Sequence, residues 1–158
     1  MRSGLQTFVT VLAIVAGASS ALADGLATRS AKGSFDDVKF DVSNVLVERG
    51  LKVSAEGNVA AMLERTGSDV GATGAALYKG AHYFTFCSAV HSRRMMEADP
   101  ALVGVCPFVV FVYETTAKPG EVVVGHRSLK GVATTAAGKA VLDEIDVWLD
   151  GIVADATK

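Results

Sequence analysis

Three side chains with donor atoms for a soft or borderline metal recur at helical spacing near the middle of the chain. Cys87, His91 and Met95 are four residues apart, so on a continuous helix they lie along one face, with Met96 beside them. A thiol, an imidazole and a thioether suit copper or haem iron and are poor ligands for calcium or magnesium. Methionines at helical spacing also commonly fill a core. Two interpretations therefore stay open, a ligand-binding face and ordinary helix packing.

Other kinds of chemistry find less support in the sequence. The motifs CxxCH for covalent haem, HExxH for zinc proteases and GxSxG for serine hydrolases are absent. A Cys87 thiolate activated by His91 would be a nucleophile, but no third group that could orient the imidazole is apparent. His82 and His126 fall at the ends of expected strands, where an imidazole is ordinarily structural. We expect His91 to be the chief ligand of any metal or haem, and the sequence favours a non-catalytic role over an enzymatic one.

Aromatic residues gather in the two most apolar segments, 83–87 and 105–114. A wall of such rings is usually part of a core. Such a flat, weakly charged surface could also form one side of a binding site for a planar apolar ligand such as b-type haem. The six residues of this wall are Tyr83, Phe84, Phe86, Phe108, Phe111 and Tyr113.

The first 23 residues have the three-part composition of a secretory signal peptide. Arg2 precedes an uncharged run at 8–17, and the small residues Ala21 and Ala23 come just before Asp24. The strongly apolar stretch of about 10 residues is too short for a spanning helix, which needs about 20. We expect residues 1–23 to be removed, the protein to be periplasmic or secreted, and no membrane anchor to remain.

Removing 23 of the 158 residues leaves 135, the usual size of one domain. The formal net charge of −2 becomes −3, because Arg2 leaves with the leader. Mild acidity argues against nucleic acid as a partner.

The hydrophobic periodicity predicts an α+β fold. Residues 24–33 are polar and aperiodic, which predicts a flexible or strand-like lead-in. Helices are expected after Ser34, Asn58, Ser88 and Thr135, and strands at 51–55, 83–87, 105–114 and 121–127. Helices interleaved with about four strands are typical of a two-layer sandwich, in which helices cover one face of a mixed sheet. The single α+β domain is then expected at residues 34–155.

Cys87 and Cys106 could form a disulfide outside the cytoplasm. However, the segments 83–87 and 105–114 would be parallel strands if the helix between them were a crossover. The two cysteines would then lie at opposite sheet edges, separated by well over about 10 Å, whereas a disulfide allows about 7 Å between Cα atoms. This topology disfavours the bridge.

Four segments together resemble the domain of unknown function 302 family: SFDDV at 34–38, ERGLKV at 48–53, FCSAVHSRRMMEADP at 86–100 and CPFVVFVYE at 106–114. The resemblance covers nearly the whole chain after the leader. It implies a compact α+β fold that tends to form homodimers and has no established enzymatic role. The sequence departs from the commoner pattern, because Ser88 follows the first cysteine and Cys106 precedes Pro107. The CSAVHS segment is similar to an exported branch associated with haem or metal binding.

Two function classes are favoured at this stage, while an enzyme of undetermined type stays open as a third. The first is a periplasmic, non-catalytic and dimeric binding domain. It would hold b-type haem, or copper as second choice, through His91 with help from Met95 or Cys87. The second is a cofactor-free accessory or interaction protein of the cell envelope that serves a membrane or electron-transfer partner.

Overall fold

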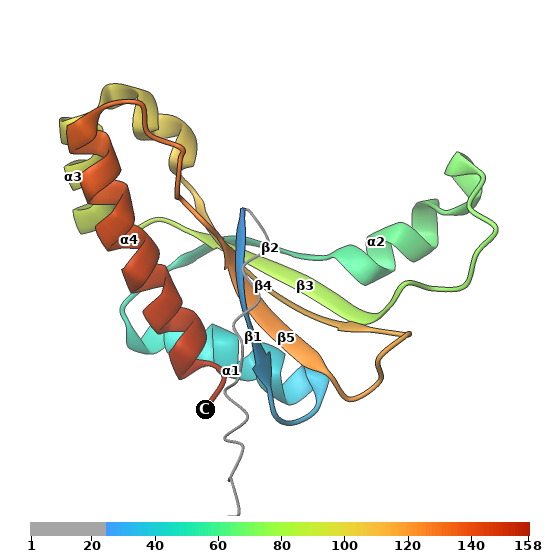
Figure 1. Cartoon of the computed structure of the whole chain (residues 1–158). Helices are drawn as coiled ribbons and strands as arrows, with labels where there is room; N and C mark the ends of the chain where they lie inside the picture. The colour runs from blue at the N-terminus through green and yellow to red at the C-terminus, as the bar shows by residue number, and fades with distance from the viewer. Residues whose placement is uncertain (1–24) are drawn as a thin grey trace, which may run out of the picture.

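The computed structural model describes residues 25–158 of the chain (Figure 1). The expected leader at residues 1–23 lies outside the described residues. Within the described part, no helix has both the length and the apolar character needed to cross a membrane. The elements in chain order are β1 (Leu26–Ala31), α1 (Phe35–Glu48), β2 (Val53–Asn58), α2 (Val59–Thr66), β3 (Tyr78–Phe86), α3 (Ala89–Ala98), β4 (Phe108–Thr115), β5 (Val122–Arg127) and α4 (Ala136–Asp155), with short 3-10 helices at Ser68–Val70 and Pro100–Val105.

The strands form one sheet in the order β1-β5-β4-β3-β2, and every neighbouring pair is antiparallel. Helices pack against this sheet, so the predicted α+β class is confirmed. The sheet differs in two details from the mixed sheet of about four strands that the sequence predicts: it has five strands, and none of its pairs is parallel. The additional strand is β1, formed by a segment for which the composition predicts a flexible or strand-like lead-in. It pairs with β5 along its whole length.

The antiparallel pairing of β3 and β4 brings the two cysteines together. Phe86 pairs with Phe108, so Cys87 and Cys106 lie at the same end of the sheet. They form a disulfide with a Cα–Cα distance of 6.2 Å. The prediction that the cysteines lie at opposite sheet edges is therefore wrong. That prediction assumed that α3 alone carries the chain across the sheet. Instead, the 3-10 helix that follows α3 packs against it, and the chain returns to the end of the sheet at which β3 stops.

The core lies between one face of the sheet and helices α1 and α4. Along β4, Phe108, Val110 and Val112 are buried, while the residues between them are half-buried. Each helix contributes a stripe of apolar residues at three- and four-residue spacing, as an amphipathic helix requires. The buried residues of these stripes are Val38, Val42 and Leu46 in α1, and Leu142, Ile145, Leu149 and Ile152 in α4.

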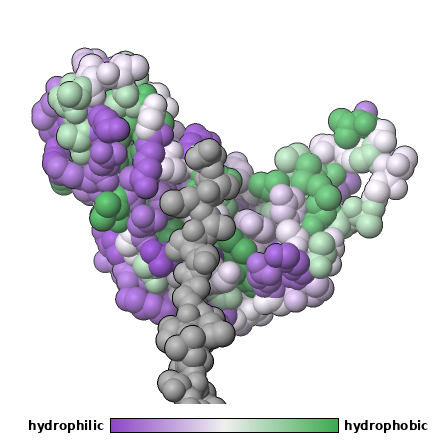
Figure 2. All heavy atoms as spheres, in the orientation of Figure 1, coloured by the Kyte–Doolittle hydropathy of each residue, from purple (hydrophilic) through white to green (hydrophobic). Residues whose placement is uncertain are grey.

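Helix α2 lies apart from the other helices and projects from the side of the sheet (Figure 1). It contacts β3 and the 3-10 helix that follows it, and none of its residues is buried. Met62 is 41% exposed, Leu63 is 40% exposed, and Val70 is 78% exposed. Figure 2 shows a largely hydrophobic surface here, in contrast to the mostly hydrophilic surface over α3 and α4.

A buried polar network links β5 to α4. The His126 ring is fully buried, and its Nε2 lies 3.1 Å from Asp150 Oδ1 while its Nδ1 lies 3.0 Å from the Arg127 carbonyl oxygen. The buried Asp146 carboxylate accepts a hydrogen bond from the Leu129 N–H at 2.8 Å. Both ring nitrogens of His126 have a partner within the chain, which agrees with the structural role expected for this residue.

Glycines allow aromatic rings to lie across neighbouring strands. A Cβ atom at Gly125 in β5 would lie 2.6 Å from the Phe111 ring and 2.6 Å from the Ala27 carbonyl oxygen. A Cβ atom at Gly57 in β2 would lie 2.5 Å from the Tyr83 ring. Real Cβ atoms do not approach other atoms so closely, so each ring depends on the missing side chain of its neighbour.

We predict that Gly125→Ala destabilises the protein by about 1–3 kcal/mol, the usual cost of overpacking a tight site. Urea unfolding followed by circular dichroism measures the change. Gly104→Ala is the control, because a Cβ atom there has no heavy atom within 4 Å. Equal stability of the two variants would contradict the packing of Phe111 on Gly125.

Candidate functional site

The alternation of side chains along β3 and β4 divides the aromatic wall between the two faces of the sheet. Phe84, Phe86 and Phe108 point toward the helices and are 2%, 0% and 2% exposed. Their neighbours within the strands, Tyr83, Thr85 and Val109, point to the opposite face and are half-buried. The wall is therefore not one surface. We use the name aromatic face for the side of the sheet that points away from the helices. It includes the outward residues of the wall together with three neighbours, and it consists of Tyr78, Tyr83, Val109, Phe111, Tyr113 and Val123.

Three rings of the aromatic face form a continuous row. Phe111 and Tyr113 are nearly parallel, with centroids 6.3 Å apart and an interplanar angle of 24°. Tyr78 meets Tyr113 edge to face at a centroid distance of 6.0 Å. Aromatic pairs at such distances attract each other beyond their area of contact, so the row forms a stable platform. The chain has three tyrosines, and all of them lie on this face.

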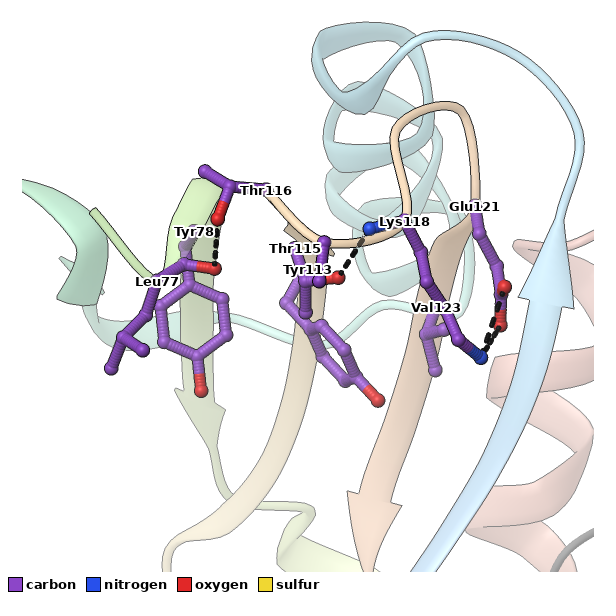
Figure 3. Close-up of a pocket in the computed structure, with 9 residues that line it drawn as sticks. Leu77, Tyr78, Tyr113, Thr115, Thr116, Lys118, Glu121 and Val123 are labelled. Carbon is purple, nitrogen blue, oxygen red and sulfur yellow. Dashed lines mark hydrogen bonds and ion pairs between the residues drawn. The ribbon is translucent and has the colours of Figure 1, made fainter. Parts of the chain in front are cut away.

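A pocket of about 400 Å³ lies at the end of this row, next to the turn between β4 and β5 (Figure 3). Its apolar walls are Leu77, the rings of Tyr78 and Tyr113, and Val123. Figure 3 shows the two phenol rings side by side, with their hydroxyl ends directed the same way. The volume falls within the range of small-molecule sites, roughly 300–1,000 Å³.

The turn that closes the pocket is held by the carboxylate of Glu114. This side chain is 7% exposed, and it accepts hydrogen bonds from the Gly120 N–H at 2.8 Å and the Lys79 ammonium at 2.9 Å. These hydrogen bonds, first that of Gly120 and then that of Lys79, hold the pKa of Glu114 below its ordinary value. The carboxylate therefore stays ionised at neutral pH and fixes the shape of the turn.

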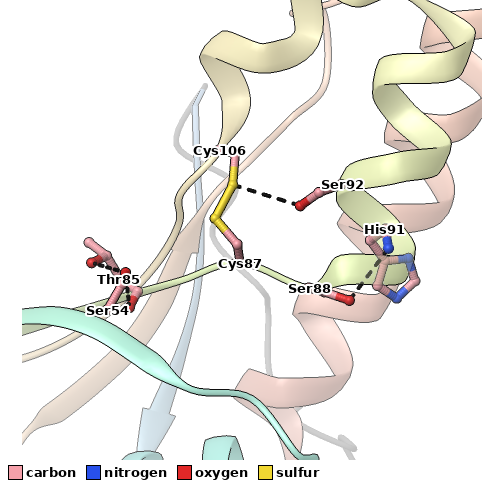
Figure 4. The surroundings of a disulfide bond; sticks show 7 residues. All are labelled: Ser54, Thr85, Cys87, Ser88, His91, Ser92 and Cys106. Atoms are coloured by element: carbon pink, nitrogen blue, oxygen red, sulfur yellow. Dashed lines mark hydrogen bonds between the residues drawn. A yellow bond between two sulfur atoms is a disulfide. The ribbon is translucent and has the colours of Figure 1, made fainter.

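The residues that the sequence singled out as ligands lie elsewhere, in α3 and just before it. Figure 4 shows Cys87 and His91. The Cys87 sulfur is bonded to Cys106 and is not available as a thiolate. Met95 is fully buried in the core, as the packing interpretation of the methionines predicts. Ser92 rather than His91 is directed at the bridge, with its Oγ 3.7 Å from Cys106 Sγ. The three predicted ligands therefore do not share an open face.

The imidazole of His91 packs against the indole of Trp148 from α4, with ring centroids 4.2 Å apart. Its Nδ1 atom is buried and has no hydrogen-bond partner. A histidine that binds metal through Nε2 normally donates its Nδ1–H to an acceptor, and here that N–H would be buried without one. Within residues 25–158, no group of three or more His, Cys, Asp or Glu residues is placed to hold a metal ion. The residues present at this place therefore do not fit haem or copper.

Burial lowers the pKa of His91, and the positive charge of Arg94 lowers it further, while Glu144 opposes the change. The ring is accordingly a neutral aromatic partner of Trp148 near pH 7. His82 also has a local partner, because its Nε2 lies 3.2 Å from Glu56 Oε2.

The residues of the pocket carried no chemical motif, so their types and spacing did not identify them in the sequence. Period-two alternation in 83–87 and 105–114 would have separated Tyr83, Phe111 and Tyr113 from the core phenylalanines. Leu77 and Tyr78 offered no such signal, because the turn between β4 and β5 brings their neighbours into place only in the folded chain.

Comparisons with known proteins identify the family and the fold. The family model described as the domain of unknown function DUF302 matches residues 26–156. The chain is similar to the crystal structure of an uncharacterized conserved protein DUF302 from Bacillus stearothermophilus, with a TM-score of 0.70 and 15% sequence identity. The match covers 85% of this chain and 99% of that chain. At this identity it shows the fold alone. No curated protein matches the chain.

We predict that His91 makes the stability depend on pH. Because its folded-state pKa lies below the ordinary value of 6.5, the unfolded chain takes up a proton that the folded chain does not. The contribution of the neutral His91 ring to the free energy of unfolding is therefore fully present above about pH 6.5, and it is lost as the pH falls below that value. Urea unfolding at a series of pH values should show wild type losing stability relative to His91→Gln over this range. A difference between the two proteins that stays constant with pH would contradict the burial of His91.

Proposed function

The chain belongs to the DUF302 family, whose function is unknown, and from this premise we propose that it is a non-catalytic binding domain of the cell envelope that binds through its aromatic face. The proposal keeps the binding role expected from the sequence but moves it from the His91 face to the outer face of the sheet.

The observation that carries the proposal is the composition of the aromatic face. An antiparallel sheet that packs helices on one face usually presents polar side chains on the other. Here the outward positions of β3 and β4 include Tyr83, Phe111 and Tyr113, all half-buried. Contiguous apolar surface of this kind on a small domain typically marks an interaction site. The pocket beside Tyr78 adds the concave shape that a bound molecule needs.

The chemistry of the face supports binding rather than catalysis. Lys118 and Glu121, the charged side chains that line the pocket, form an ion pair with each other at 3.3 Å. Cys87 and Cys106 are joined in the disulfide. The aromatic face therefore provides contact area for a ligand. Its residues do not include a nucleophile and a base within reach of each other, which nucleophilic catalysis requires.

The disulfide and the leader-like N-terminal sequence support a location outside the cytoplasm. Disulfides persist in oxidising compartments and are rare in the cytosol. The similarity of CSAVHS to an exported branch of the family points the same way. The expected homodimer and the expected electron-transfer or envelope partner stay predictions.

We predict that the neutral dye Nile red binds the native protein and that Phe111→Ser weakens this binding about tenfold, because it removes the ring that stacks on Tyr113 at one end of the row. Titration followed by dye fluorescence gives the dissociation constants. Phe40→Ser makes the same chemical change on the outer side of α1, where Phe40 is 64% exposed, and should leave binding unchanged. Circular dichroism must show that both variants are folded. Equal weakening by the two variants, or none by Phe111→Ser, would refute the assignment of the aromatic face.

A further inference from the structure

The polar groups around the pocket are almost all committed to partners within the chain. The Lys118 ammonium pairs with the Glu121 carboxylate. The Thr115 hydroxyl accepts a hydrogen bond from the Lys118 N–H at 3.2 Å, and the Thr116 hydroxyl donates to the Ala76 carbonyl oxygen at 2.6 Å. Each charged group and each hydroxyl of the turn therefore already has one partner within the chain, although the Thr115 hydroxyl can still donate.

Two phenol groups are the exception. Among the hydrogen bonds of residues 25–158, none involves the hydroxyl of Tyr78 or Tyr113. Figure 3 accordingly draws no interaction between either hydroxyl and the other residues of the pocket. A phenol hydroxyl can donate one hydrogen bond and accept another. It can therefore meet one uncharged polar group of a ligand whose apolar part lies on the rings.

The remaining walls favour apolar contact. Leu77 is 67% exposed, although it lies beside the ring of Tyr78. Val123 is 9% exposed and closes the opposite side. A ring that fills the space between them would remove the Leu77 side chain from water, which is favourable.

We propose that this pocket binds an uncharged aromatic compound of about two fused rings that carries a single hydrogen-bonding group such as a hydroxyl. The inference rests on the proposed function and names the class of ligand. An anion or a cation would have to lose water without gaining an ionic partner, or would have to separate Lys118 from Glu121.

The test compares three naphthalene probes of nearly equal size on the purified exported protein. 2-Naphthol is neutral, 2-naphthoate carries a negative charge, and 2-(aminomethyl)naphthalene carries a positive charge at pH 7. Isothermal titration calorimetry measures each dissociation constant. We expect 2-naphthol to bind at least tenfold more tightly than either charged probe. Equal or tighter binding of a charged probe overturns the ligand class.

Variants locate the binding. Tyr113→Ala should weaken the binding of 2-naphthol at least tenfold, and Leu77→Ser should weaken it several-fold without disturbing the core, because Leu77 is largely exposed. Tyr83→Ala, on the aromatic face but outside the pocket, should weaken it at most about twofold, and Phe40→Ala should not change it. If Leu77→Ser has no effect, or Tyr83→Ala has as large an effect as Tyr113→Ala, the pocket is not the site.

The outcomes also separate this inference from the function on which it rests. Nile red bound at Phe111 together with no binding of 2-naphthol would overturn the ligand class and leave the aromatic face as the binding surface. Failure of both probes would overturn the proposed function as well.

Discussion

Side chains along β4 point alternately toward the helices and away from them, and this alternation determines both the core and the aromatic face. Phe108, Val110 and Val112 pack against α1 and α4, so their neighbours Phe111 and Tyr113 must face outward. The arrangement cannot shift by one residue, because every buried side chain would then exchange places with an outward one. The glycines opposite the outward rings reinforce it, since Gly125 accommodates Phe111 and Gly57 accommodates Tyr83. The aromatic face is thus a consequence of the same pairing that builds the core.

Local signals in the sequence predicted much of the fold. Ser34, Asn58, Ser88 and Thr135 each begin the helix expected after them, and each side chain accepts a hydrogen bond from the backbone N–H three residues later. Nonlocal features were missed. β1 is polar in sequence and is defined by its pairing with β5, about 100 residues away in the chain. The direction of β4 depends on the 3-10 helix Pro100–Val105, and without that helix the parallel pairing and the separated cysteines followed.

The candidate site shows the same division between local and nonlocal information. The spacing of four residues predicted that Cys87, His91 and Met95 share one helix face. Cys87 precedes α3, which begins at Ala89, and spacing does not reveal what packs on a helix face. In the folded chain the disulfide occupies Cys87, the core encloses Met95, and Trp148 covers His91. Conversely, the pocket residues come from the end of β4, the following turn and the start of β3, which meet only through the sheet register. Soft donor atoms at helical spacing therefore did not identify an open ligand-binding face.

The central claim is that the aromatic face is covered by a bound molecule where the protein works. All three tyrosines of the chain lie on this face, so nitration by tetranitromethane reports on it alone among the surfaces of the protein. Mass spectrometry can compare the nitration of Tyr78, Tyr83 and Tyr113 in intact cells that produce the protein with that in purified, dialysed protein. We expect Tyr78 and Tyr113 to be strongly protected in cells and to become reactive after purification. Equal nitration of these two tyrosines in both samples would contradict a binding role for this face.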